Sequence, residues 1–108
     1  MTPHHVEIRN GGEVVAAADV TLPAAGIART SLQAAAGHVA PGWRTNLVDA
    51  VMDLPEVRAS QRLEATVPLG DVEFLERLRE RTFGAVTRPA GSTVLLDAMI
   101  PPVATERP

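Results

Sequence analysis

The stretch between Pro41 and Pro55 constrains the fold of this chain more than any other segment. Its apolar residues recur at steps of three and four, as they do on one face of an α-helix: Trp43, Leu47, Ala50, Val51 and Leu54. Proline suits the first turn of a helix, where its missing N–H leaves no bond unmade, and it blocks continuation further along. The stretch predicts an amphipathic helix that begins near Pro41, ends before Pro55 and is anchored in the core by Trp43.

The length of 108 residues predicts one domain, which we place at residues 4–102 with 103–108 as a flexible tail. Only 3% of the residues are aromatic, so the core must be aliphatic. Small aliphatic cores bury less area than aromatic ones, and self-association is a natural way to cover the apolar surface that remains.

Composition narrows the classes of partner. All ten basic residues are arginine, the net charge is −3 and no basic cluster is present, so we expect no nucleic-acid partner. Frequent Ala, Arg, Gly and Pro without Lys indicate a GC-rich bacterial genome.

No cysteine means no disulfide and no thiolate zinc site. Neither a membrane-spanning apolar run nor a signal peptide is visible, so we expect no membrane partner and a cytoplasmic protein.

The pattern of the first third of the chain predicts antiparallel strands. Apolar and polar residues alternate over 5–9 and over 13–22, with the turn residues Asn10, Gly11 and Gly12 between the two segments. The segment 27–36 is ambiguous between strand and helix, because its alanine run favours a helix. We favour a strand, because a turn precedes the segment and a helix there would lack an apolar stripe.

The second half predicts a strand, a helix and one or two closing strands. A polar connection over 56–61 leads to a strand over 62–67, and Asp71 is placed to cap a helix that Gly84 ends. Within that helix Glu73 and Arg77 have the spacing of an ion pair. A short strand over 85–88 and a long one over 93–100 follow.

These elements predict an α+β fold. We expect a mainly antiparallel sheet of five to six strands with two helices, in the order βββαβαβ(β).

A short motif agrees with this order. Val39, Pro41, Trp43 and Arg44 match a Val-x-Pro-x-aromatic-Arg segment, and the chain resembles the C-terminal part of GNAT-type N-acetyltransferases, as a half fold. The resemblance implies a helix start where a glycine-rich loop holds the pyrophosphate of acetyl coenzyme A. That loop is missing, since Thr45 follows Arg44 directly, so we expect no cofactor and assign no acetyltransferase activity.

The candidate site residues are few, and no catalytic constellation is visible. Val39, Trp43 and Arg44 are the candidate ligand-binding residues, because an arginine at a helix start can bind a phosphate or carboxylate. Adjacent histidines on a strand, His4 and His5, point to opposite faces, so we expect no metal site. A weak site combining one of them with His38 stays an alternative.

Two carboxylates and three arginines are interpreted as solvated surface. Asp49 and Asp53 lie one turn apart on the polar face of the central helix, and we expect both to be hydrated. The arginines of the second helix, which alternate with glutamates, are expected to form a solvated face as well: Arg77, Arg79 and Arg81.

Two functional hypotheses remain open. In the first, the protein acts without catalysis, by binding itself as a homodimer or binding a protein partner, through Leu95 and Met99 on the second face of the last strand. In the second, it is a degenerate acetyltransferase-like protein that binds an acyl-CoA or another small anionic ligand at the start of the central helix.

Overall fold

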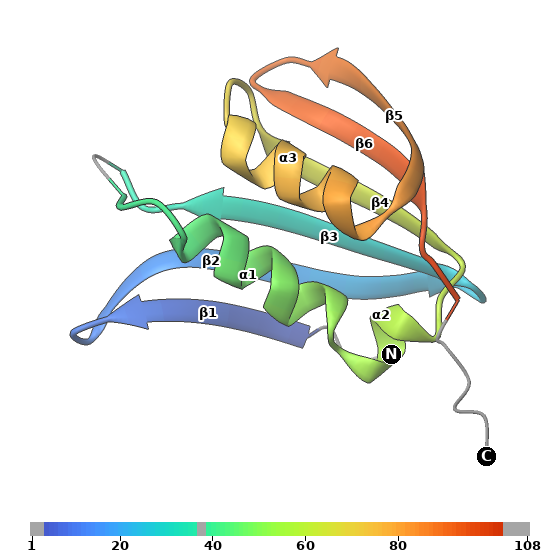
Figure 1. Cartoon of the computed structure of the whole chain (residues 1–108), viewed down its shortest axis with the longest axis horizontal. Coiled ribbons are helices and arrows are strands. Elements are labelled where there is room, and N and C mark those ends of the chain that lie inside the picture. The colour runs from blue at the N-terminus through green and yellow to red at the C-terminus, as the bar shows by residue number, and fades with distance from the viewer. Residues whose placement is uncertain (1–3, 37–38, 103–108) are drawn as a thin grey trace.

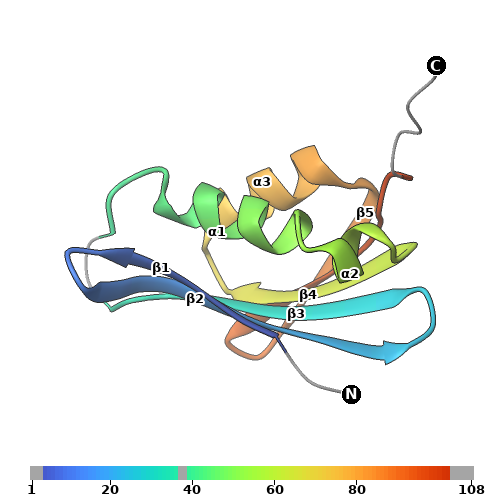
Figure 2. The same cartoon turned by 90° about the horizontal axis from the view of Figure 1, so that it is seen from below.

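A computed structural model describes residues 4–36 and 39–102 of the chain. Six strands form one twisted sheet, and all helices lie on one of its faces (Figure 1; Figure 2). The strands are β1 (His4–Asn10), β2 (Glu13–Ala24), β3 (Ile27–Ala34), β4 (Arg62–Pro68), β5 (Phe83–Ala90) and β6 (Thr93–Met99). The helices are α1 (Trp43–Met52), α2 (Pro55–Arg58) and α3 (Val72–Arg81). The predicted α+β class and element order are confirmed, with α2 as an additional short helix.

The sheet order is β1-β2-β3-β4-β6-β5, and every neighbouring pair is antiparallel except β3 and β4. The parallel ladder begins at Ile27 and Arg62 and ends at Ser31 and Thr66, although both strands continue further. The strand ends therefore separate on the side where α1 and α3 begin (Figure 1). This opening brings the first turns of the two helices to one end of the molecule.

Strand alternation places the core where the sequence predicts it. Residues 27–34 form a strand, which settles the ambiguous segment, and residues 35–36 lie beyond it. On each inner strand every second residue is buried against the helices: Ala16, Ala18, Val20, Ala28, Thr30, Leu32, Leu63, Ala65, Val67, Val94, Leu96 and Ala98. The opposite face of the sheet carries no helix in the described part of the chain (Figure 2).

The buried face of α1 differs from the predicted one. The helix begins at Trp43 after Gly42, whose φ of 99° only glycine adopts readily, rather than at Pro41. Its buried residues are Leu47, Val48, Val51 and Met52. Trp43 is only half-buried, because the first residue of α1 lies at the margin of the helical layer. Trp43 is therefore not one of the fully buried residues of α1, and its role as the anchor of the helix stays a prediction.

α1 ends at Met52, before Pro55 as predicted, and Pro55 also begins a second helix. It occupies the first turn of α2, where a missing N–H costs nothing, and Val57 of that helix is fully buried. Ser60, also buried, donates its hydroxyl to the carbonyl of Glu56 at 2.9 Å. The predicted polar connection over 56–61 is thus partly core.

The boundary between α3 and β5 is also corrected. Thr82 is the C-terminal cap of α3, with φ −135° and ψ 178°, so the chain turns directly from helix into strand. Gly84 lies in β5 with φ 65°, at the register shift between Phe83 and Val86. It serves a β-bulge rather than a helix cap.

Thr30 supplies a stability prediction. Its side chain is 1% exposed, and its hydroxyl has no hydrogen-bond partner among the described residues. Thr30→Val should stabilise the protein by about 1 kcal/mol, because it removes an unsatisfied buried hydroxyl at constant shape. Urea titration measures the change. Thr66→Val, on the open face, is the control and should stay within about 0.5 kcal/mol of the parent. A destabilised Thr30→Val protein would mean that the hydroxyl has a partner.

Candidate functional site

The start of α1 is the candidate ligand site, and it lies beside the start of α3. The two helices run in the same direction, so their N-termini are neighbours (Figure 1). Each N-terminus carries unpaired N–H groups and a partial positive charge. Two such ends side by side repel each other unless negative charge lies between them.

Glu73, in the first turn of α3, supplies that negative charge. Its Oε2 accepts hydrogen bonds from the Gly42 N–H at 3.0 Å, from the Thr45 N–H at 3.1 Å and from the Thr45 hydroxyl at 3.0 Å. Partial burial opposes ionisation, yet these hydrogen bonds outweigh it and lower the pKa of the Glu73 carboxyl. The carboxylate of α3 therefore acts as the capping group of α1. The predicted pair between Glu73 and Arg77 is wrong, because Glu73 faces α1 instead.

Arg44 and Asp71 make a second contact between the helix starts. Arg44 Nε donates to Asp71 Oδ2 at 2.8 Å, and the two side chains are only 20% and 9% exposed. The other carboxylate oxygen of Asp71 accepts from the Phe74 N–H at 3.3 Å, which confirms the predicted cap of α3. The Arg44 guanidinium also lies 5.8 Å from the centre of the Phe74 ring. Arg44, which the sequence offers as a candidate to bind an anionic ligand, is thus paired within the chain.

Further along the same helices, α1 supplies the carboxylates and α3 supplies the arginines, which is the reverse of the arrangement at the helix starts. Asp49 accepts from Arg77 at 2.8 and 2.9 Å and from Arg81 at 2.8 Å, and Asp53 accepts from Arg81 at 2.7 Å. Hydrogen bonds from Arg77 and Arg81 lower the pKa of the Asp49 carboxyl. The prediction of a solvated face is wrong for Asp49, Arg77 and Arg81, which are partly buried and join α1 to α3. Asp53 is 63% exposed and fits the prediction of a hydrated carboxylate, although it pairs with Arg81.

The predicted ligand residues are only partly brought together. Trp43 and Arg44 lie in the first turn of α1, and Val39 is half-buried in the segment before it. A hollow of about 350 Å³ adjoins Arg44 and is lined further by residues 68–73. A pyrophosphate would need the N–H groups at the start of α1, but Gly42 and Thr45 already donate to Glu73. The residues present do not fit the coenzyme A group that the resemblance implies.

His4 and His5, the two histidines within the described residues, form no joint site. His4 contacts Glu56, whereas the ring nitrogens of His5 lie 2.8 Å from Asp19 and 2.9 Å from Glu7. The two histidines therefore use different faces of β1, as predicted. His38 lies outside the described residues. Within 4–36 and 39–102, no group of His, Asp and Glu side chains is arranged to hold a metal ion.

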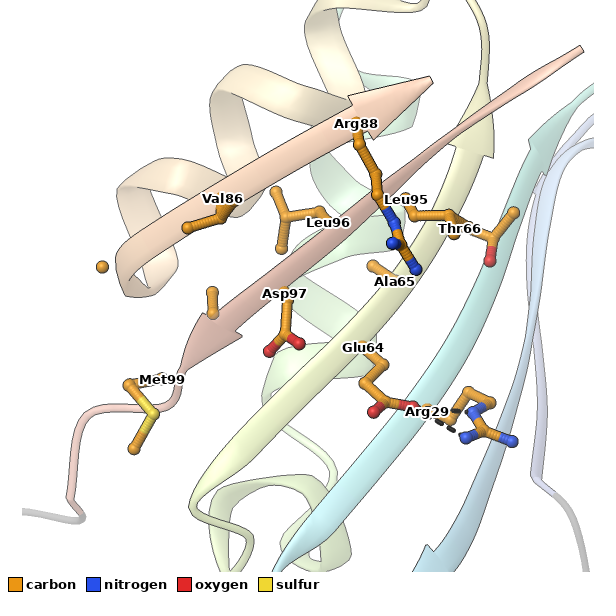
Figure 3. A pocket seen from close by; sticks show the side chains of 12 residues that line it. Arg29, Glu64, Ala65, Thr66, Val86, Arg88, Leu95, Leu96, Asp97 and Met99 are labelled. Atoms are coloured by element: carbon orange, nitrogen blue, oxygen red, sulfur yellow. Dashed lines mark hydrogen bonds and ion pairs between the residues drawn. The ribbon is translucent and has the colours of Figure 1, made fainter. Parts of the chain in front are cut away.

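The open face of the sheet carries a second candidate site over β4, β6 and β5. A shallow hollow of about 720 Å³ there is lined by an apolar patch, which we define as Val86, Leu95 and Met99 (Figure 3). Val86 is 68% exposed and Met99 39%, and Leu95 is half-buried. Phe83, opposite Met99 in the ladder, is 52% exposed. Exposed apolar patches of this kind, ringed by polar groups, are typical of interaction surfaces.

Sequence reasoning identified Leu95 and Met99 but missed Val86. The signal was present, because residues 85–88 were expected to be a strand and Val86 alternates with Ala85. What the sequence lacked was the register, which places Val86 opposite Asp97, on the same face as Leu95 and Met99.

Comparisons with known proteins support the fold. No protein-family model and no curated protein sequence matches the chain. Solved structures do match: the GNAT domain of S. lividans PAT at TM-score 0.62 and 16% identity, and a GNAT-family acetyltransferase from Streptococcus pneumoniae at 0.64 and 14%. The diaminobutyrate acetyltransferase EctA from Paenibacillus lautus, solved with its substrate and coenzyme A, matches at 0.63 and 15%.

The matched regions are most of this chain but only part of the others. They cover 91%, 90% and 90% of this chain and 61%, 66% and 69% of those three chains. The chain thus spans about two thirds of their length. At these identities the likeness establishes a GNAT-like fold, in agreement with the resemblance seen in the sequence, and carries no statement about activity.

The Glu73 contact generates a stability prediction. Glu73→Gln should cost about 2 kcal/mol at pH 7, because charge-assisted hydrogen bonds at a helix N-terminus are lost. A lowered pKa means that this stabilisation is complete above the ordinary glutamate pKa, near 4.5, and disappears as the pH falls through the folded-state value. The difference between parent and variant in urea titrations should therefore shrink below about pH 4.5.

The control for this prediction is Glu76→Gln, an exposed glutamate on the same helix. It should change the free energy of unfolding by less than about 0.5 kcal/mol at either pH. Equal effects of the two substitutions would contradict a capping role for Glu73.

Proposed function

We propose that the protein acts without catalysis, as a binding module of acetyltransferase-like fold that associates with a second copy of itself. The observation that carries this proposal is the apolar patch of Val86, Leu95 and Met99 on a sheet face that no described helix covers. A two-fold contact allows the same patch to serve both copies, which is the commonest form of self-association.

The edges of the sheet direct association to this face. β5 interrupts its ladder with a bulge at Gly84 and carries Pro89, which has no N–H to donate. At the other edge, the extra residue of the β1–β2 ladder is Val15 of β2, and β1 itself exposes the charged residues Glu7 and Arg9. Pairing of edge strands between copies is therefore unfavourable at both ends of the sheet, whereas the open face is unobstructed.

The closed start of α1 supports a role without catalysis. The groups that would hold an anionic ligand are bonded to Glu73 and Asp71.

None of the helices in residues 4–36 and 39–102 is long and apolar enough to cross a membrane. A chain without cysteine also suits the bacterial cytoplasm, which we propose as its compartment.

Binding of a small anionic ligand at the start of α1 is the second candidate, favoured by the hollow beside Arg44 and by the bound coenzyme A of EctA. Acetyl coenzyme A at millimolar concentration separates the two candidates, since a specific ligand raises the melting temperature. Our proposal expects no shift. A saturable shift that Arg44→Ala removes would favour the ligand-binding candidate.

Self-association is tested by sedimentation velocity from one to several hundred micromolar. The parent protein should shift from monomer to dimer mass as its concentration rises. Val86→Asp should weaken the dimer at least about tenfold, because it places a charge in a dry contact, and Met99→Asp should weaken it by a smaller factor, because Met99 lies toward the margin. Both sites are exposed in the monomer, so folding should be preserved.

The matched control is Val72→Asp, at a site that is 60% exposed but lies on α3, away from the open face. It should leave the dimer intact. A parent protein that stays monomeric across the whole range would refute the proposal.

A further inference from the structure

Arg88 is an unusual charge on the open face. It extends from β5 over the sheet and lines the same hollow as the apolar patch (Figure 3). The other two arginines of this region have carboxylate partners: Arg29 with Glu64 at 2.8 Å and Arg62 with Asp97. For Arg88, the part of the chain that the structure describes offers no hydrogen bond or ion pair. The pKa of the Asp97 carboxyl is lowered mainly by the hydrogen bonds from Arg62 and to a smaller extent by the charge of Arg88 in the same chain.

The register of β5 and β6 places Arg88 at one corner of a rectangle of four side chains on the open face. Arg88 is opposite Leu95, and Val86 is opposite Asp97. The corners are separated by about 4.8 Å between strands and about 6.7 Å along a strand. The charged residues Arg88 and Asp97 occupy one diagonal of this rectangle, and the apolar residues Val86 and Leu95 occupy the other.

This arrangement is complementary to itself. A two-fold axis that lies in the contact plane along the Val86–Leu95 diagonal exchanges the two charged corners. It brings Val86 and Leu95 against their own copies and places each Arg88 near the Asp97 of the other copy. The strands of the two sheets then cross steeply, which is one of the two preferred ways in which sheets pack. Because the two sides of the rectangle differ in length, the axis brings Arg88 near Asp97 rather than directly over it. The long arginine side chain spans the remaining distance.

We propose that two copies of this chain pack across the open face with Arg88 of each copy paired to Asp97 of the other, around a centre made by Val86 and Leu95. This inference rests on the self-association proposed above and specifies its geometry. Asp97 can take a second arginine, since it is 48% exposed while paired with Arg62. Met99 and Phe83 lie at the margin of this contact.

Alternative occupants fit the face less well. A peptide strand would need a free sheet edge, but the β5 edge is interrupted by a bulge and by Pro89, and the β1 edge exposes charged side chains. A small anionic ligand would meet Arg88 but also Glu64 and Asp97, whose carboxylates line the same hollow. A second copy offers a carboxylate to each Arg88 and an arginine to each Asp97, so its charges match.

Charge exchange between two variants tests the pairing. Arg88→Glu alone and Asp97→Arg alone should each raise the dimer Kd about tenfold or more, because each homodimer brings like charges together twice. An equimolar mixture of the two variants should form a heterodimer with a Kd within about threefold of the parent value, since both cross-contacts are again of opposite sign. Sedimentation of fluorescently labelled mixtures measures all three constants.

Two controls keep the test interpretable. Arg58→Glu makes the same charge change on α2, on the other face of the sheet, and should leave the Kd unchanged. Asp97→Arg also removes the Arg62 partner, so a double-mutant cycle with Arg88→Ala and Asp97→Asn is measured in parallel. If the pair exists, the double variant should lose no more affinity than either single variant.

The outcomes separate this inference from the proposed function. A dimer of the parent protein that is weakened by Val86→Asp but unaffected by Arg88→Glu would overturn the pairing and leave self-association standing. Weak association of both charge variants without recovery in the mixture, together with additive effects in the cycle, would also overturn the pairing. A monomeric parent protein would overturn both.

Discussion

The contact between the Glu73 carboxylate and the first turn of α1 is the constraint on which the helical layer depends. α1 and α3 run parallel, so the positive ends of both helices meet where β3 and β4 separate. Glu73 places a negative charge between them and bonds two N–H groups and one hydroxyl of α1. Further along the helices, Arg77 and Arg81 bind Asp49, and Arg81 is a cation in the last turn of α3, where the negative helix end favours it. Charge thus fixes the helices as a parallel pair above an aliphatic core.

The same contact closes the helix start at which the resemblance to GNAT-type N-acetyltransferases implies an anion site. A helix start with free N–H groups attracts an anion. In this chain the Glu73 carboxylate takes the place of such an anion, and the neighbouring Arg44 is bound to Asp71. Fold similarity at about 15% identity is therefore compatible with a different use of the molecule. The uncovered sheet face, with its apolar patch, is the surface that this account assigns to binding.

Local patterns in the sequence predicted most of the fold. Period-two alternation located the strands and their buried faces, and Asp71 was recognised as a helix cap because its partner, Phe74, is three residues away. The failures involve long-range contacts. Glu73 was paired with Arg77 by local spacing, but its true partners, Gly42 and Thr45, are distant in sequence. No periodicity reveals that two helices lie parallel.

The outer face shows the same division. Leu95 and Met99 were predicted to be available for contact because β6 is apolar on both sides, and this follows from alternation alone. Val86 and Arg88 join them only through the pairing of β5 with β6, and that register depends on the bulge at Gly84. A bulge shifts every later side chain relative to the partner strand, so neither residue could be placed from the sequence.

NMR titration of the Glu73 carboxyl carbon and of the Gly42 and Thr45 amide signals shows whether this carboxylate caps α1. The account predicts that Glu73 titrates below the ordinary glutamate value near 4.5, and that both amide protons follow the same curve because they donate to that carboxylate. An ordinary pKa for Glu73, with Gly42 and Thr45 amides that do not respond to its protonation, would contradict the claim that the chain closes its own helix start.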